Sequence, residues 1–359
     1  MSRTKSILAL LALFFLAACS SSPSSGPSDA EQEDSADAGP QIFKRLSIEE
    51  SGIDFRNDIV ETKEYNYFAF QYTYNGAGVG VGDLDNDGLP DLYFSGNQVP
   101  DRIYRNEGHL KFKDISKTAG IDHQGGFNFG VTFVDINQDG WQDIYVCRSG
   151  HKGLTKEKAN LLYINNHDLT FTESAQAYGL ADQGYSIQSA FFDYDHDGDL
   201  DMYLTQHPVD YGQNLKERLD KMKAPEDDIS DKMYRNNGDN TFTNVTDIAG
   251  VRNYGHGLGL VIWDINEDGW DDIYVGNDYQ SADYVYINNQ NGTFTDRMKE
   301  YFPHIPYYSM GVDVADIDND GLLDMNVVEM LPENYHRMIL NVSDLSEQNY
   351  YVFEEVGFH

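Results

Sequence analysis

The sequence predicts an all-β protein, a β-propeller built from four-stranded blades. Three observations carry this prediction. One nine-residue acidic loop occurs five times, the loops recur about every fifty residues, and each repeat unit holds several short apolar runs separated by turn signals. The loops start at Asp83, Asp135, Asp193, Asp264 and Asp316, so consecutive starts are 52, 58, 71 and 52 residues apart. A period of this length indicates one supersecondary unit per repeat.

Each unit contains four segments typical of short strands. The first precedes the acidic loop, as in G-V-G-V-G (78–82) or V-T-F-V (131–134), and the second follows it, as in I-Y-V-C-R (144–148). The third segment reads R-I-Y-R-N (102–106) in the first unit and is followed by an Asn- and Gly-rich hairpin and by a fourth segment, F-K-D-I. Four short antiparallel strands per period describe a propeller blade, in which neighbouring sheets bury each other's faces.

All five loops, which we call cages 1 to 5, obey the pattern D-x-[DN]-x-D-G-x-x-D. Oxygen atoms at positions 1, 3 and 5 of such a loop converge, and the glycine at position 6 makes the turn that allows a carbonyl at position 7 to join them. A carboxylate at position 9 completes the set. An all-oxygen set without Cys or His suits Ca²⁺ better than Zn²⁺ or Mg²⁺, so we expect up to five calcium ions. The predicted ligands are Asp83, Asp85, Asp87, Leu89 and Asp91; Asp135, Asn137, Asp139, Trp141 and Asp143; Asp193, Asp195, Asp197, Asp199 and Asp201; Asp264, Asn266, Asp268, Trp270 and Asp272; and Asp316, Asp318, Asp320, Leu322 and Asp324.

The alternative reading of one such loop is a polar hairpin turn, because Asx-turns use the same residues. Five copies favour metal binding, since carboxylates about 4 Å apart repel by roughly 4 kcal/mol at an effective dielectric constant near 20. An EF-hand would carry Glu at position 12, whereas these loops have Phe94, Val146, Leu204, Val275 and Val328 there, which indicates flanking strands. Asn137 and Asn266 remove one charge each, so we expect weaker affinity in cages 2 and 4.

The chain is strongly acidic, with 60 Asp and Glu against 25 Lys and Arg and a formal net charge of −35. Such a surface repels nucleic-acid phosphates and anionic lipid, so nucleic acid is not an expected partner.

The amino terminus predicts export. Residues 1–18 read as a signal peptide, with Arg3 and Lys5 followed by a short apolar run. The sequence L-A-A-C ending at Cys19 resembles the bacterial lipobox, which implies a lipid anchor on Cys19 and a location in the cell envelope, with Ser20 favouring the outer membrane. The alternative is an ordinary cleaved signal with an incidental Cys. Residues 19–41, rich in Ser, Pro and acidic residues, predict a disordered tether.

Residues 42–332 hold the predicted blades, and 333–359 begin a further, incomplete segment. The stretch 43–53 resembles the fourth strand at 112–121 and is therefore expected to be an outer strand without its own blade. The third unit carries an insert from 207 to 231 with a predicted short amphipathic helix. The second cysteine, Cys147, lies in an apolar run and is expected in the core.

The pattern G-x-x-x-x-D-x-D-x-D-G-x-x-D followed by Y-x-N-x-G-x-x-x-F resembles the FG-GAP/VCBS repeat of integrin-alpha-like β-propellers. It is most similar to repeats of bacterial lipoproteins with an ASPIC/UnbV segment, related to cartilage acidic protein. The resemblance implies Ca²⁺ in each acidic loop and a ring of seven blades, whereas this chain supplies four full blades and a partial fifth, an open arc. The F-G dipeptide occurs as Phe129-Gly130, with variants Leu258-Gly259 and Met310-Gly311 and a more distant Ser189-Ala190.

No catalytic motif is evident, because the ten His residues form no metalloprotease or phosphate-loop pattern. The favoured function is a calcium-binding, envelope-anchored scaffold that recognises a protein or glycan partner. The alternative is part of an envelope enzyme or assembly factor whose chemistry lies in a missing carboxy-terminal region or in the central channel. A cluster of His and carboxylate groups in the channel, together with hydrolytic activity, would favour this alternative.

Overall fold

The computed structural model describes residues 43–330, apart from 64, 68–69, 122–125, 150–157, 209–228, 279–280 and 307. The chain divides into two units, Met1–Leu46 and Ser47–His359. In the first unit, the described residues 43–46 form neither helix nor strand. The signal peptide, Cys19, the tether 19–41, residues 209–228 of the insert with its predicted helix, and the segment 333–359 all lie outside the described residues and stay predictions.

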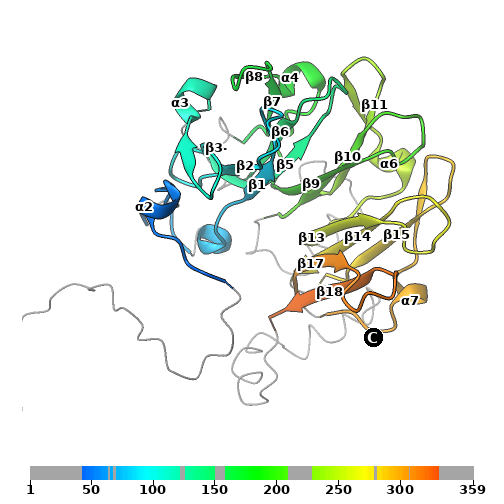
Figure 1. The fold of residues 1–359 in the computed structure, drawn as a ribbon. Coiled ribbons are helices and arrows are strands. Elements are labelled where there is room, and N and C mark those ends of the chain that lie inside the picture. The colour runs from blue at the N-terminus through cyan, green and yellow to red at the C-terminus, as the bar shows by residue number, and fades with distance from the viewer. Residues whose placement is uncertain are drawn as a thin grey trace, which may run out of the picture. The chain divides into compact units, whose positions relative to one another are not determined.

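The described residues of the second unit form four four-stranded antiparallel sheets and one two-stranded hairpin, which confirms the predicted four blades and partial fifth (Figure 1). Each sheet uses four consecutive strands in chain order. Blade 1 is β1 (Val79–Gly82), β2 (Asp91–Phe94), β3 (Arg102–Asn106) and β4 (Phe112–Asp114), and blade 2 is β5 (Phe127–Val134), β6 (Asp143–Ser149), β7 (Leu161–Asn165) and β8 (Phe171–Glu173). Blade 3 is β9 (Ser186–Phe192), β10 (Asp201–Gln206), β11 (Lys232–Asn236) and β12 (Phe242–Asn244), and blade 4 is β13 (His256–Trp263), β14 (Asp272–Asp278), β15 (Tyr284–Asn288) and β16 (Phe294–Asp296). Blade 5 is β17 (Ser309–Ala315) and β18 (Asp324–Glu329).

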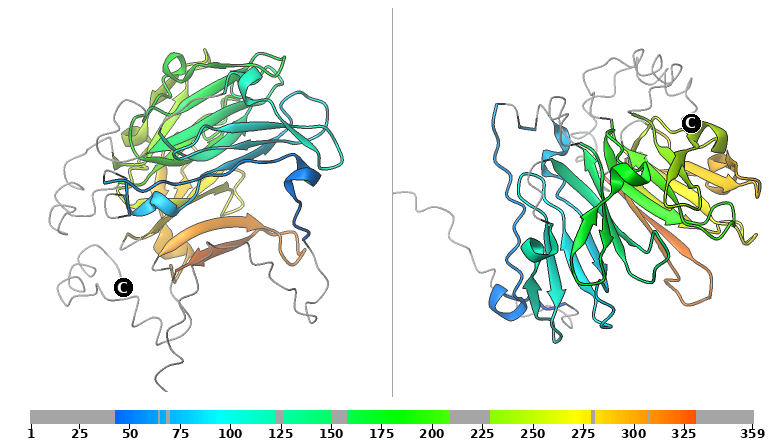
Figure 2. Two further views of the ribbon diagram at one scale, coloured as in Figure 1. Left: turned by 90° about the vertical axis from the view of Figure 1, so that its left-hand side faces the viewer. Right: turned by 90° about the horizontal axis from the view of Figure 1, so that it is seen from above.

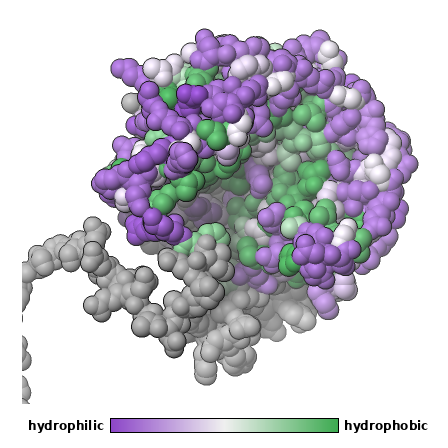
Figure 3. Space-filling view, viewed as in Figure 1, coloured by the Kyte–Doolittle hydropathy of each residue, from purple (hydrophilic) through white to green (hydrophobic). Residues whose placement is uncertain are grey.

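The first strands of successive blades lie against one another in the order β1, β5, β9, β13 and β17, so the blades follow each other around a common line (Figures 1 and 2). Apolar residues gather in the hollow that these strands border, while hydrophilic residues cover much of the surrounding surface (Figure 3). The sheets therefore form an open series of blades rather than a closed ring.

The core lies between the blades. One apolar cluster joins Tyr93 of blade 1 to Ile144 of blade 2, and the next joins Tyr145 of blade 2 to Met202 of blade 3. Adjacent residues of one strand point to opposite faces, so Ile144 and Tyr145 serve different clusters. This alternation explains why the second strands of blades 2, 3 and 4 are almost entirely buried.

A helical turn that the sequence analysis did not predict follows the fourth strand of each full blade. These turns are α3 (Ser116–Ala119), α4 (Ala175–Tyr178), α6 (Thr246–Ala249) and α7 (Met298–Tyr301). Gly120, Gly179 and Gly250 end the first three in the left-handed region, which glycine adopts without steric cost. The sequence signal for these helical turns is the A-G or Y-G dipeptide that follows the fourth strand.

The prediction that 43–53 forms an outer strand is wrong. Residues 43–47 form neither strand nor helix, and the residues after them form a helical turn, α2 (Ile48–Ser51), with a Ser47 and Glu50 capping box and Gly52 at its end. A Cβ on Gly52 would lie 2.3 Å from the carbonyl oxygen of Phe112 in blade 1, and one on Gly179 would lie 3.0 Å from that of Phe242 in the next blade. The segment thus repeats the outer turn of a preceding blade, and no third strand is present beside it among the described residues to pair with.

The start of one strand and the equivalence of one dipeptide differ from prediction, whereas the predicted burial of Cys147 is confirmed. Strand β5 begins at Phe127 rather than 131, because its amino-terminal half pairs with the end of β6 across a register shift. The blade 3 equivalent of Phe129-Gly130 is Ile187-Gln188 rather than Ser189-Ala190, since Gln188 and Gly259 occupy the same ladder position. Cys147 is fully buried in the core, and burial raises the pKa of its thiol to about 12.

Another short helix, η1 (Gln71–Tyr74), precedes blade 1. Among the described helices, none combines the length and the apolar character that a membrane crossing needs.

Candidate metal centres

All five cages share one backbone arrangement built around the position 1 aspartate. In cage 1 the amide of Asp87 donates to Asp83 Oδ1 at 3.1 Å, and the amide of Gly88 donates to Asp83 Oδ2 at 2.8 Å. The amide of Leu89 then donates to Asp87 Oδ1 at 2.9 Å. The corresponding bonds recur in the other four cages, with lengths of 2.7 to 3.1 Å. The sequence pattern therefore specifies the loop, because the aspartates at positions 1 and 5 accept particular backbone amides in every cage.

The turn also requires left-handed backbone at two positions. Position 4 carries Asn86, Gln138, His196, Glu267 and Asn319, with φ between 56° and 62°. The glycine at position 6 has φ between 85° and 95° in every cage. Both conformations curl the loop so that its side chains face inward.

In cages 1 to 4, the position 9 aspartates are the most buried of the predicted side-chain ligands. In cage 1, Asp91 Oδ2 accepts the amide of Leu84 at 3.0 Å and Oδ1 accepts the amide of Asn106 at 2.7 Å. Burial raises the pKa of this carboxyl to about 6, and the same cause raises the pKa of Asp201 in cage 3 to about 8. Asp324 in cage 5 is exposed, because the described part of blade 5 has no third strand to cover it.

The position 3 carboxylates supply the observation that bears most directly on a ligand. In cages 1 and 3, the Oδ1 atoms of Asp85 and Asp195 are buried and accept no hydrogen bond. A buried carboxylate oxygen without a partner is costly, so the same vacancy at the same position of two repeats calls for a positively charged group. Donor chemistry composed only of oxygen fits a hard divalent cation.

The structure brings three carboxylates together in cages 1, 3 and 5, with one oxygen of each within 4.8 Å of the others. These sets are Asp83, Asp85 and Asp91; Asp193, Asp195 and Asp197; and Asp316, Asp318 and Asp320. In cages 2 and 4, the amide nitrogens of Asn137 and Asn266 instead donate to Asp139 and Asp268 at 3.0 and 3.1 Å.

Cages 1 to 4 lie side by side. Asn86 of cage 1 donates to the carbonyl oxygen of Gly140 in cage 2 at 3.1 Å, and Gln138 of cage 2 donates to that of Gly198 in cage 3 at 2.6 Å. The ring of His196 in cage 3 stacks on Trp270 in cage 4, with 3.7 Å between centroids. The position 4 residue therefore links each of these cages to the next.

The third-strand asparagines are further site residues that were not predicted. Their repetition in the Y-x-N pattern of the third strand is a sequence signal for them. Besides donating its amide to the position 9 aspartate, Asn165 donates its side chain to the carbonyl oxygen of Leu84 in the preceding blade at 2.9 Å. Asn288 does the same to Tyr194 at 2.9 Å. These residues connect a cage to its own third strand and to the neighbouring blade.

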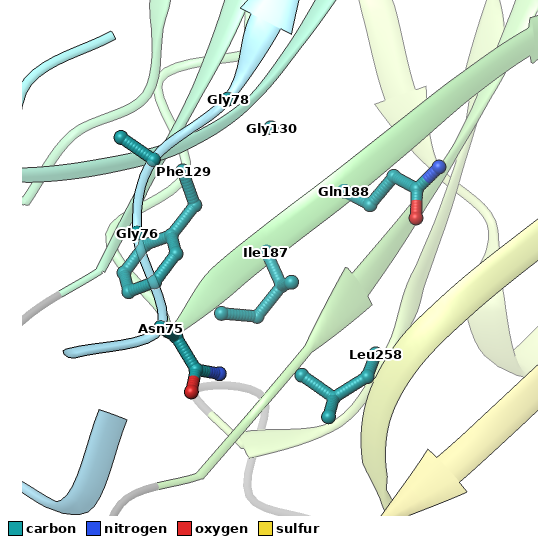
Figure 4. A pocket seen from close by; sticks show the side chains of 9 residues that line it. Asn75, Gly76, Gly78, Phe129, Gly130, Ile187, Gln188 and Leu258 are labelled. Atoms are coloured by element: carbon teal, nitrogen blue, oxygen red, sulfur yellow. The ribbon is translucent and has the colours of Figure 1, made fainter. Parts of the chain in front are cut away.

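A pocket of about 220 Å³ lies where the first strands meet (Figure 4). Phe129, Ile187 and Leu258 from blades 2, 3 and 4 point into it, and Gly78 and Gly130 bring the backbone close. The F-G dipeptides and their variants therefore line the inner surface of the blades.

A second polar cluster lies at the strand ends opposite the cages. Tyr72 donates to Asp278 and packs edge-on against His207, with 4.1 Å between centroids, and His207 lies 5.0 Å from His256. These four side chains are at most 6% exposed. Such burial is typical of side chains that pack one element against another, here η1 against blades 3 and 4. The cluster could not be predicted from local sequence patterns, because its members are up to 206 residues apart.

Comparison with known proteins gives consistent results. A model of the FG-GAP-like repeat matches residues 83–146 and 264–327. Cartilage acidic protein 1 of Mus musculus is 24% identical over 274 residues, and that of Homo sapiens is 26% identical over 275 residues, each covering 73% of this chain. The chain spans about 40% of the length of these relatives.

Solved structures also show similarity. An Agrocybe aegerita lectin, described as recognising non-reducing terminal N-acetylglucosamine, aligns with a TM-score of 0.38 and 18% identity over 69% of this chain and 59% of its own. An exo-inulinase from Aspergillus awamori aligns with a TM-score of 0.35 and 12% identity over 64% of this chain and 51% of its own.

Proposed function

Because this chain carries FG-GAP-like repeats, we propose that it is a β-propeller scaffold whose rim is held together by Ca²⁺. The observation that carries the proposal is the pair of buried, unpartnered oxygens, Asp85 Oδ1 and Asp195 Oδ1, at equivalent positions of two repeats. A bound cation would be a partner for these two oxygens, which accept no hydrogen bond from the protein.

The residues that would hold the ion are the side chains at positions 1, 3, 5 and 9 and the carbonyl at position 7 of each cage. A divalent cation there would neutralise carboxylates that otherwise repel one another. Since Asn86, Gln138 and His196 connect adjacent cages, ordering one loop would stiffen its neighbour. The expected effect of Ca²⁺ is thus on the rigidity of the whole rim.

The scaffold is proposed to work in the cell envelope, held by a lipid on Cys19, and to bind a protein or glycan through its loops. The lipobox-like sequence and the acidic tether support the location, and the absence of a recognised catalytic motif supports binding over catalysis. The alternative, an enzyme or assembly factor, would be favoured by a cluster of His and carboxylate groups, and one such cluster contains Tyr72, His207, His256 and Asp278. It supports that alternative less well, because its side chains are enclosed.

Thermal unfolding in calcium and in EDTA tests the metal site. At a free Ca²⁺ concentration 100 times the Kd, each specific site is expected to add about 2.7 kcal/mol. The melting temperature should therefore rise with Ca²⁺ and much less with Mg²⁺ at equal ionic strength. An unchanged melting temperature after EDTA treatment would refute calcium binding.

A glycan array and a surface-protein pull-down, each probed with calcium-loaded and EDTA-treated protein, test the binding role. Calcium-dependent retention of a ligand without turnover is the expected result. Hydrolysis of a retained ligand would instead favour the enzyme alternative.

A further inference from the structure

One arginine contacts the acidic ligands of cage 1 from the third strand. Arg105 on β3 places Nε 2.6 Å from Asp85 Oδ2 and Nη2 3.1 Å from Asp87 Oδ2. Asp85 Oδ1, the other oxygen of the same carboxylate, stays buried without a partner. Arg105 therefore neutralises the carboxylate from one side and leaves its second oxygen available.

The equivalent ladder position of cage 3 also carries an arginine. Arg235 precedes Asn236 on β11 as Arg105 precedes Asn106 on β3, at the same position of the ladder. Asp195 Oδ1 is again the buried oxygen without a hydrogen bond.

Cages 2 and 4 lack both members of the pair. Where cages 1 and 3 have Asp at position 3, these cages have Asn137 and Asn266. At the ladder position of the arginines they have Ile164 and Ile287. Aspartate thus occurs with arginine and asparagine with isoleucine in all four blades that have a third strand in the described part of the chain.

The pairing equalises charge. The side chains at positions 1, 3, 5 and 9 carry four negative charges in cage 1 and three in cage 2, and Arg105 reduces the first to a net −3. We expected weaker cation binding in cages 2 and 4 from the number of carboxylates in each loop. That count did not include the charge of a third-strand residue. The Arg105–Asp85 pair is partly buried, and a purely structural ion pair would not explain why arginine occurs with aspartate at position 3 and isoleucine with asparagine.

Building on the proposed calcium function, we propose that Arg105 and Arg235 are counter-charges that adjust the cation affinity of cages 1 and 3 to that of cages 2 and 4. They are positioning residues: Arg105 holds the outer oxygen of the position 3 carboxylate, and each arginine adds one positive charge beside its loop. The predicted consequence is that ligand and counter-charge can be exchanged together but not separately.

The position 6 glycines provide a cage-by-cage readout, because each donates its amide to the position 1 aspartate. The full chain, labelled with ¹⁵N-glycine, is titrated with Ca²⁺ while the amide signals of Gly88 and Gly140 report cages 1 and 2. R105I should tighten binding at Gly88 about tenfold, because a positive charge near the ion is removed. D85N should weaken it by at least as much, and D85N/R105I should return it close to wild type.

Cage 2 offers the reverse experiment as a matched control. I164R should weaken binding at Gly140, N137D should tighten it, and N137D/I164R should again approach wild type. In EDTA, R105I should also lower the melting temperature, since Asp85 and Asp87 then repel without compensation. Circular dichroism before titration excludes variants that have not folded.

The outcomes separate the two proposals. If no glycine amide of the wild-type protein responds to Ca²⁺, the proposed calcium function fails. If the amides respond but R105I leaves the affinity at Gly88 unchanged or weaker, or if the double variants show no restoration, the counter-charge role of the arginines is refuted while calcium binding stands.

Discussion

At the scale of single residues, a tyrosine on the second strand of each full blade is held by a polar group from the loop that follows. Tyr203 donates to Asp231 Oδ2 at 2.9 Å, and the amide of Gln206 donates to Asp231 Oδ1 at 2.7 Å. In blade 2 an asparagine, Asn160, takes this place and contacts Tyr145 at 2.9 Å. The position therefore needs hydrogen bonding rather than charge.

The buried Asp231 predicts a pH dependence of stability. Burial raises its pKa from 3.8 to about 7, so the folded state binds the proton more tightly than the unfolded state. The stabilising contribution is complete below about pH 4 and is lost as pH rises through about 7. In EDTA, the free energy of unfolding of D231N should fall less than that of wild type between pH 5 and 8, by a few kcal/mol since each pKa unit is worth about 1.4 kcal/mol.

Urea unfolding at the two pH values measures this difference. D247N is the control. Hydrogen bonding to Arg252 lowers the pKa of the Asp247 carboxyl, so this group does not titrate in the pH range tested. Parallel pH profiles for wild type and D231N would show that Asp231 does not titrate in this range.

At the scale of elements, glycines on the first strands set how closely the blades approach. A Cβ added to Gly130 on β5 would lie 2.5 Å from the carbonyl oxygen of Ile187 on β9. Gly311 occupies the equivalent place on β17, where an added Cβ would meet Val328 at an ordinary 3.4 Å. The same dipeptide position is thus tightly packed in blade 2 and open in blade 5.

G130A should consequently destabilise the protein by about 1–3 kcal/mol, the usual range for overpacking, because backbone rather than a flexible side chain must move. G311A, which alters the same ladder position, should change stability by less than about 0.5 kcal/mol. Thermal and urea unfolding of both variants in calcium provide the comparison. Equal effects would mean that the close approach of β5 to β9 is not what requires glycine.

At the scale of the whole molecule, the two outermost blades differ from the inner ones in exposure. Val79 and Val81 of β1 are 55% and 60% exposed, and Val328 of β18 is 52% exposed, whereas Val146 and Val275 on inner blades are fully buried. Blade 5 also has only two strands in the described part of the chain. Stability should therefore be lowest at this edge.

Hydrogen exchange measured by mass spectrometry should show β17 and β18 exchanging faster than β13 and β14, by a factor of about a hundred or more, since local opening of an edge hairpin exposes little additional apolar surface. Calcium should slow exchange in the loops of cages 1 to 4 together, because adjacent loops are linked. Equal protection of blades 4 and 5 would contradict this order.

The repeat, the acidic loops and the strand boundaries to within a few residues could all be predicted from the amino-acid sequence. They could be predicted because turn chemistry and strand alternation depend on residues close together in the chain. The internal geometry of cage 1 follows from the spacing of Asp83, Asp87 and Gly88 alone. Only the tertiary structure decided which strands lie between blades, that Arg105 reaches Asp85, that Asn165 joins two blades, and that residues near Ile48 form a helical turn. These contacts join residues many positions apart, and their energies depend on burial and on the approach of neighbouring sheets, which no local pattern encodes.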